Sequence, residues 1–297
     1  MPHDTPLLTT MAAAFAAAWI LGILAQKVRL SPIVGYLLAG VAIGPYTPGF
    51  HGDVKLASQL AEVGVVLLMF GVGLHFHLAD LLAVKRIAIP GALIQCSVAT
   101  GLGLLLGLAM GWPPSKGLVL GMALSVASTV VLLRGLEAHD LVSTPSGHVA
   151  IGWLIVEDIL TVVVLVVIPA LAPSAGGSGL PQAMAIALLK LAVLVVLVLV
   201  VGARVLPRVL TLVARLRSRE LFTLTILAIA IAVATLASVV FGASMALGAF
   251  LAGMVVSQSP VSAPAAADAL PLRDAFAVLF FVSVGMLLDP GFLVREP

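Results

Sequence analysis

The chain is divided into long stretches that contain no Asp, Glu, Lys or Arg. Four of them cover residues 5–26, 30–52, 87–115 and 159–189, and a fifth, 221–267, is 47 residues long. A transmembrane helix needs about 20 predominantly apolar residues, because charged side chains are costly in hydrocarbon. Only 9% of all residues are charged, against about 25% in ordinary soluble domains. The pattern therefore predicts a membrane protein and excludes a water-soluble globule.

These stretches predict an all-α, polytopic membrane protein made of ten helices with short connections. The longest stretch holds two helices and is expected to turn near Gly242. One membrane domain is expected over residues 1–297, with no soluble domain. The expected helices cover about 7–26, 32–48, 56–76, 87–110, 117–137, 147–171, 183–204, 219–240, 243–258 and 272–288.

Several function classes have no support in the sequence. Fifteen basic and thirteen acidic residues give a net charge of +2, far too even for nucleic-acid binding. The single cysteine, Cys96, cannot form an intramolecular disulfide. No nucleophile elbow, P-loop or dinucleotide-binding fingerprint is present. We therefore expect neither an enzyme nor a bound cofactor.

Basic residues are distributed unequally between the two sides of the expected helices. Alternate connections place eleven Lys and Arg on one side and three on the other, with Lys190 left uncounted. Basic loops stay in the cytoplasm, so the N-terminus is expected outside. The densest basic segment, residues 204–219, is expected to be a solvated cytoplasmic loop near anionic lipid head groups.

Two adjacent acids, Glu157 and Asp158, interrupt the expected sixth span, with apolar residues on both sides. Ionisable groups inside a span suggest a functional site. Successive helix residues point about 100° apart, so one acid can face a water-filled cavity while the other meets a neighbouring helix.

Desolvation and mutual repulsion are expected to raise the proton affinity of at least one of these acids. Such a carboxylate holds a proton or a small cation in competition, which is the minimal chemistry of a cation:proton antiporter. The alternative is a structural pair, satisfied by a helix-end donor or by a lysine from another span.

Other polar residues within the spans are less specific. Glu62, in the third span, has a functional and a structural interpretation of equal weight. Ser125, Ser128 and Thr129 lie at i, i+3 and i+4, on one face of a continuous helix. On spacing alone, hydrogen bonds back to helix carbonyls are favoured for these hydroxyls over a binding role. No metal site beyond a transported cation is expected.

Several sequence blocks resemble one family in order across the chain: residues 34–45 (VGYLLAGVAIGP), 61–74 (AEVGVVLLMFGVGL), 156–159 (VEDI), 248–253 (GAFLAG) and 279–286 (LFFVSVGM). They are similar to the Kef-type members of the monovalent cation:proton antiporter-2 family, especially its YbaL-like branch. The resemblance implies a sodium/proton-antiporter-like fold of about thirteen helices, in which two inverted repeats cross a pair of discontinuous helices.

The resemblance also assigns roles to residues. It places the ion-binding aspartate on Asp158 with Glu157 beside it, and the crossing of the first discontinuous helix around Ser128 and Thr129. It implies a homodimer. The chain ends after the tenth expected helix, without the last three helices and the nucleotide-binding regulatory domain of such proteins. This chain alone is therefore expected to be inactive or unstable.

The sequence thus predicts a monovalent cation:proton antiporter, for potassium or sodium, in the inner membrane of a bacterium. Its partners would be the cation, the proton and membrane lipid. Two alternatives stay open: a cation-conducting pore that uses the same acids for selectivity, and an inactive truncated fragment of the antiporter.

Overall fold

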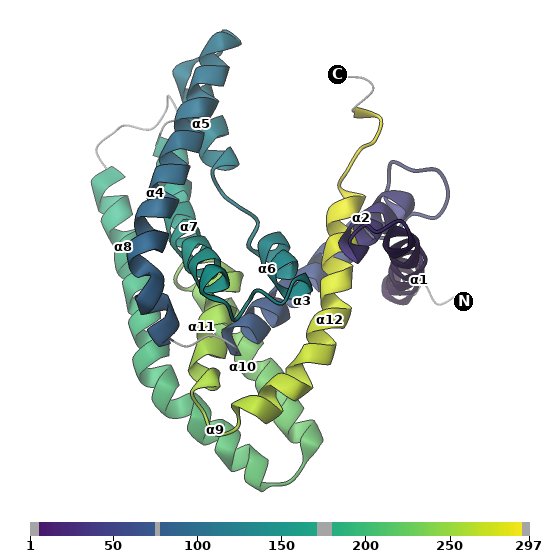
Figure 1. The fold of residues 1–297 in the computed structure, drawn as a ribbon, viewed down its shortest axis with the longest axis vertical. Coiled ribbons are helices and arrows are strands. Elements are labelled where there is room, and N and C mark those ends of the chain that lie inside the picture. The colour runs from purple at the N-terminus through teal and green to yellow at the C-terminus, as the bar shows by residue number, and fades with distance from the viewer. Residues whose placement is uncertain (1–5, 75–77, 171–179, 293–297) are drawn as a thin grey trace. The chain divides into compact units, whose positions relative to one another are not determined.

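The computed structural model describes residues 6–74, 78–170 and 180–292, and all regular structure in these ranges is helical (Figure 1). Six of the described helices are long and apolar enough to cross a membrane, and α2 and α11 are shorter apolar helices. The elements are α1 (Pro6–Lys27), α2 (Pro32–Ile43), α3 (Val54–Leu74), α4 (Leu78–Ala109), α5 (Pro114–Leu124), α6 (Thr129–Ala138), α7 (Pro145–Ala170), α8 (Leu180–Val196), the π-helix η1 (Leu197–Gly202), α9 (Ala203–Arg215), α10 (Arg219–Val239), α11 (Met245–Ser257) and α12 (Ser262–Met286).

Each of the ten segments expected from the sequence overlaps with helical structure in the described ranges, but the fifth is interrupted; residues 75, 76 and 171 of the expected segments lie outside those ranges. The expected helix 117–137 is two helices, α5 and α6, separated by four residues. The turn expected near Gly242 is present, and Gly242 adopts a φ of 70° there, a conformation that glycine tolerates without strain. Ser244 then caps α11, because its side chain accepts a hydrogen bond from the Leu247 N–H.

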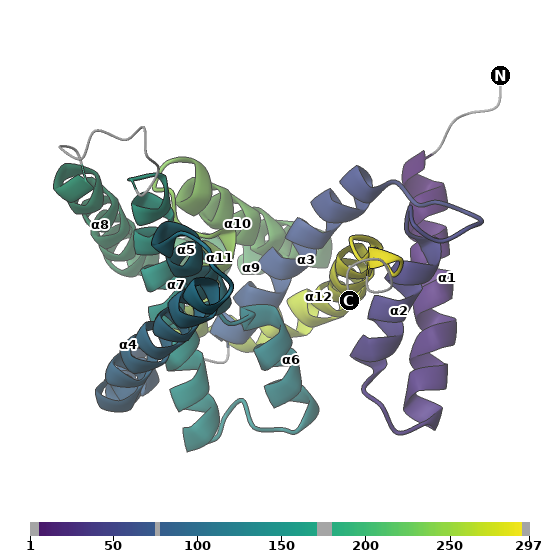
Figure 2. The ribbon, with the colours of Figure 1, turned by 90° about the horizontal axis from the view of Figure 1, so that it is seen from above.

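The helices form two compact units, and the first combines the two ends of the chain. It contains residues 1–68 and 266–297. Within it, α1 and α2 lie side by side (Figure 2), and small buried residues such as Ala14, Ala18 and Ala39 form its core with Leu279 of α12. Close backbone approach through small residues replaces the burial from water that drives packing in soluble proteins.

The second unit, Met69–Ala265, contains the functional residues predicted from the sequence on α6 and α7. All residues of α11 from Leu247 to Ser257 are buried. In contrast, α4 is apolar but mostly exposed along its candidate span. Exposed apolar helices around a buried one are the arrangement that lipid, rather than water, requires.

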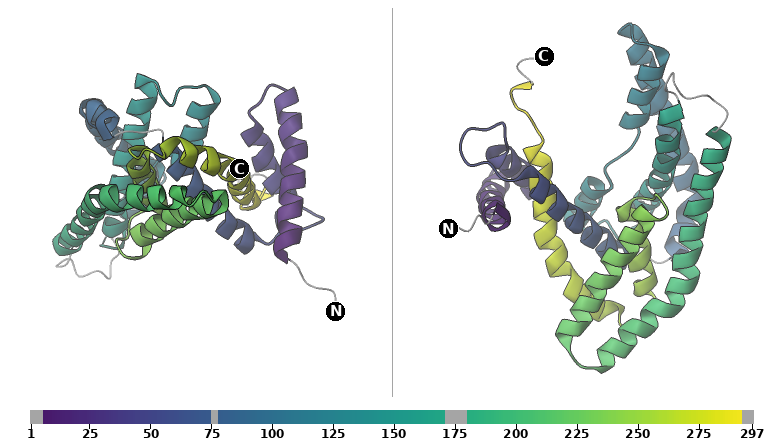
Figure 3. Two further views of the ribbon diagram at one scale, coloured as in Figure 1. Left: turned by 90° about the horizontal axis from the view of Figure 1, so that it is seen from below. Right: turned by 180° about the vertical axis from the view of Figure 1, so that it is seen from behind.

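The basic segment from Arg204 to Arg219 is not the loop expected from the sequence. Residues up to Arg215 continue α8 and η1 as helix α9 (Figure 3), and the turn is confined to residues 216–218. The reason is the spacing of the arginines. Arg204, Arg208 and Arg215 are separated by four and seven residues, so they share one face of an amphipathic helix.

The α4–α5 contact provides a test of glycine packing. A Cβ at Gly103 would collide with the backbone at Gly121, whereas a Cβ at Gly101 would meet nothing within 4 Å. We expect Gly103→Ala to destabilise the protein by about 2 kcal/mol through overpacking. The control Gly101→Ala should leave stability unchanged or raise it by about 1 kcal/mol. Thermal unfolding of the two purified variants in detergent measures this difference, and equal midpoints would contradict the described packing.

Candidate functional site

The candidate site lies where the fifth predicted helix is interrupted. The four residues Ser125–Ser128, called here the unwound segment, connect α5 to α6. The Ser125 hydroxyl donates to the Met122 carbonyl (2.7 Å) at the end of α5. The Ser128 hydroxyl accepts from the Val131 N–H (3.4 Å) and caps α6. Both serines therefore satisfy helix ends, while the interruption itself exposes backbone groups that need other partners.

Asp158 meets the start of α6. Its half-buried carboxylate lies within the range of a polar interaction with the side chain of Thr129, the first residue of that helix. Backbone N–H groups and the helix dipole make a helix N-terminus favourable for negative charge. The structure thus brings Asp158 of α7 close to Thr129 of α6.

Glu157 has different surroundings, although it is the next residue on α7. Its side chain is only 2% exposed. The Ala127 N–H of the unwound segment donates to Oε2 (3.2 Å), and the Trp153 indole N–H donates to Oε1 (3.0 Å). Both carboxylate oxygens of Glu157 therefore have a hydrogen-bond donor within the protein.

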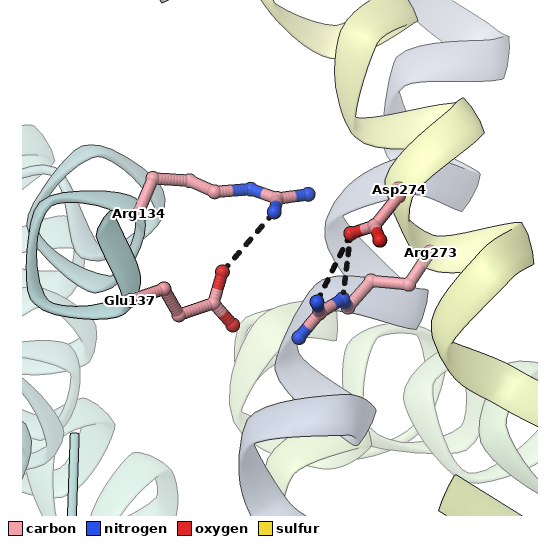
Figure 4. Close-up of polar contacts among 4 residues, drawn as sticks. All are labelled: Arg134, Glu137, Arg273 and Asp274. Atoms are coloured by element: carbon pink, nitrogen blue, oxygen red, sulfur yellow. Dashed lines mark hydrogen bonds and ion pairs between the residues drawn. The ribbon is translucent and has the colours of Figure 1, made fainter. Parts of the chain in front are cut away.

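Other charged helix residues form ion pairs. On α6, Arg134 binds Glu137 at 3.1 Å, and on α12, Arg273 binds its neighbour Asp274 at 3.0 Å (Figure 4). Within the described ranges, neither Glu157 nor Asp158 has a Lys or Arg at ion-pair distance. Asp158 is therefore a carboxylate inside an apolar helix that has a hydrogen-bond donor but no described counter-ion, which leaves its charge available to a cation.

A cavity of about 320 Å³ lies beside the unwound segment. Leu93 and Met122 contribute to its largely apolar lining, and its polar lining comes from α4, α7 and the end of α5: Cys96, Ser97, Thr100, Ser125, Glu157 and Thr161. The cavity thus reaches the unwound segment on the side of Glu157.

Two of the other sequence-predicted residues make no hydrogen bond to either acid in the part of the chain that the structure describes. Glu62 lies on α3 in the first unit, is exposed, and makes no hydrogen bond or ion pair with any residue that the structure describes. We assign it no part in the site. Ser128 caps its own helix and, in the described part of the chain, does not contact either acid.

Sequence reasoning missed Gln95 and Trp153. The Gln95 amide of α4 donates to the Ser125 carbonyl (2.9 Å) and accepts from the Trp153 indole (3.0 Å). A signal for both existed: Gln95 is a polar amide within the charge-free stretch 87–115, and Trp153 precedes Glu157 by four residues, on the same helix face.

Comparison with known proteins gives consistent matches. Residues 12–296 match the family described as sodium/hydrogen exchanger, transmembrane. YbaL, a candidate cation/proton antiporter of Escherichia coli (strain K12), is 54% identical over the whole chain, which spans 54% of YbaL. The glutathione-regulated potassium-efflux system protein KefC of Klebsiella pneumoniae subsp. pneumoniae is 32% identical over 95% of the chain, which spans 45% of KefC. The chain thus spans about half the length of these relatives.

The fold also matches a solved structure. The sodium proton antiporter MjNhaP1 from Methanocaldococcus jannaschii aligns with a TM-score of 0.66 at 16% identity, over 97% of this chain and 72% of its own. This likeness concerns the fold alone. It confirms the all-α, sodium/proton-antiporter-like fold class expected from the sequence.

Proposed function

Because the chain belongs to the sodium/hydrogen exchanger family of membrane proteins, we propose that it exchanges a monovalent cation, potassium or sodium, for protons. The observation that carries this proposal is the Asp158 carboxylate, which meets Thr129 at the start of a broken helix and has no described ion-pair partner. Broken helices in transporters provide ion sites at mid-membrane, because the helix ends at the break offer unpaired backbone dipoles.

In the proposed cycle, a cation and a proton compete for Asp158. The ionised carboxylate attracts the cation, and protonation removes that charge and releases the cation. The hydroxyl of Thr129 donates to the ionised carboxylate and so stabilises the state that receives the cation. Because both ligands use one carboxylate, the site carries one of them at a time, and this competition couples the two fluxes.

Proton movement in inverted membrane vesicles tests this function. We prepare vesicles with a pH gradient, acid inside, and hold the membrane potential at zero. We expect this pH gradient to dissipate when potassium or sodium is added. A pore would conduct the cation without moving protons under this condition, so an unchanged gradient with a large cation current would favour the pore. Two proteins should be compared: this chain, and this chain continued by the remaining membrane segment of YbaL. Failure of both would refute the exchange function.

For localisation, the chain is a multi-pass membrane protein of this family, and we propose the bacterial inner membrane with the N-terminus outside. In a Cys96→Ser background, Leu216→Cys should react with an impermeant maleimide only in inverted vesicles. Ser115→Cys, in the exposed first turn of α5, should react only in right-side-out vesicles. The reverse pattern would overturn the proposed orientation, which rests on the distribution of basic residues.

We further propose that the complete protein acts as a homodimer in contact with membrane lipid, as the family resemblance implies. The mass of the detergent-solubilised protein, measured by light scattering, tests this. A monomer that exchanges cations would contradict it.

A further inference from the structure

A chain of hydrogen bonds connects α4 and α7 to both sides of the unwound segment. From α4, the Gln95 Nε2 donates to the carbonyl of Ser125 (2.9 Å). From α7, the Glu157 Oε2 accepts from the N–H of Ala127 (3.2 Å). The Trp153 indole N–H joins the two arms, because it donates to the Gln95 Oε1 and to the Glu157 Oε1, at 3.0 Å each.

The chemistry of the indole fixes the direction of every bond in this chain. An indole nitrogen can only donate, so the amide atom of Gln95 that faces it must be the oxygen. The amide nitrogen of Gln95 then faces the Ser125 carbonyl, which can only accept. In the observed order, the amide nitrogen of Gln95 and the indole nitrogen of Trp153 each donate to an oxygen.

The two arms satisfy the backbone groups that the interruption of the helix leaves without helical partners. In hydrocarbon, no water replaces such partners, and a broken helix persists only where protein groups satisfy its free carbonyls and N–H groups. Ser125 supplies the free carbonyl and Ala127 the free N–H. A displacement of either arm would therefore change the path of the unwound segment.

The indole ring itself is held by close packing on α4. A Cβ at Gly91 would collide with the six-membered ring of Trp153, so the ring lies directly on that backbone. Gly91 follows Pro90, the proline inside α4. The position of the indole thus depends on contact with a glycine, in addition to its two hydrogen bonds.

We propose that Gln95 and Trp153 are positioning residues of the exchange site, which set the place of the unwound segment and through it the place of Thr129. Thr129 follows the segment directly, and its side chain lies close to the Asp158 carboxylate. Neither Gln95 nor Trp153 needs to touch the cation for this role. The inference rests on the proposed cation:proton exchange at Asp158.

Transport kinetics of Trp153→Phe test the proposal, because phenylalanine keeps an aromatic side chain at this position but lacks the indole donor and part of the ring that lies on Gly91. We expect the half-saturating cation concentration to rise about tenfold, the effect of one hydrogen bond to a charged group, with a maximal rate close to wild type. Trp19→Phe is the matched control, because Trp19 on α1 is 68% exposed. A purely structural role would instead lower the amount of active protein and leave the half-saturating concentration unchanged.

Gln95→Leu and the double variant Gln95→Leu/Trp153→Phe test whether the two residues act together. If both act through the unwound segment, the double variant should raise the half-saturating concentration by less than the product of the two single effects. Independent, multiplying effects would contradict a common chain of hydrogen bonds.

Cys96 provides a measurement that does not depend on transport. It is the sole cysteine of the sequence, it lines the cavity beside the unwound segment, and its thiol lies 3.8 Å from the same Ser125 carbonyl that Gln95 binds. We expect N-ethylmaleimide to alkylate Cys96 several times faster in Trp153→Phe and Gln95→Leu than in wild type and Trp19→Phe.

The two measurements separate the inference from the proposed function. If wild type exchanges no cation, the proposed function fails, and the alkylation rates still decide whether Gln95 and Trp153 position the segment. If wild type exchanges cations, but Trp153→Phe matches Trp19→Phe in both half-saturation and alkylation, the positioning role is wrong.

Discussion

Vesicles that contain the Asp158→Asn variant are expected to show no cation-dependent proton movement, with the same amount of folded protein in the membrane as wild type. Asparagine has nearly the same size and retains an oxygen that accepts from Thr129, so the packing of α7 on α6 should survive. It carries no negative charge for a cation and releases no proton. The exchange should therefore fall to the level of empty vesicles, measured as dequenching of a pH-sensitive dye after addition of potassium or sodium.

Two further variants make this result specific to the site. Glu220→Gln alters an exposed acid in the first turn of α10 and should exchange like wild type. Thr129→Val removes the donor to Asp158 but keeps the shape, and should weaken cation binding about tenfold without abolishing exchange, whereas Thr129→Ser should restore it. Exchange at the wild-type rate by Asp158→Asn would refute the assignment of Asp158.

Substitution of Glu157 is expected to have the largest effect on stability. Glu157→Ala removes the acceptor of the Ala127 N–H and one of the two acceptors of the Trp153 indole, and a donor left unsatisfied away from water costs about 1–3 kcal/mol. Glu157→Gln keeps one acceptor oxygen but places an NH₂ group against the other donor, so its effect should be intermediate. Thermal unfolding in detergent should therefore rank wild type above Glu157→Gln, and Glu157→Ala lowest.

A different outcome would support the other role considered for Glu157, that of a second ion-binding or proton-binding carboxylate. In that case Glu157→Gln would change the number of protons exchanged per cation and leave the unfolding midpoint at the wild-type value. Glu220→Ala is the control for the loss of a carboxylate, and it should not shift the midpoint because Glu220 is exposed.

Two segments of the fold differ from what their sequence predicts, for physical reasons. The fifth span was placed as one helix because Ser125–Ser128 carries neither a proline nor a glycine, and its neighbours are compatible with a continuous helix. The family resemblance implied a discontinuous helix there, but the spacing of residues did not. The dense charge of residues 204–219 predicts a loop, because such charge is typical of connections between spans. The spacing of the arginines in this segment nevertheless fits one face of the helix α9.

The sequence by itself determined the membrane class, the positions of the helical segments and the presence of two acids inside one of them. These are local consequences of a single rule, that hydrocarbon excludes charge and requires about 20 apolar residues per crossing. The tertiary structure alone decided which partners each acid has. Glu157 and Asp158 are neighbours in sequence, and the helical turn between them showed only that they point apart.

Their partners come from other parts of the chain. Ala127 lies 30 residues from Glu157, and Gln95 lies 58 residues from Trp153. No local pattern predicts such contacts, because they exist only after α4 and α7 have packed around the break between α5 and α6. That packing, and not the spacing of the acids, places Asp158 near the start of α6. The same packing lets Glu157 bind the backbone of the unwound segment.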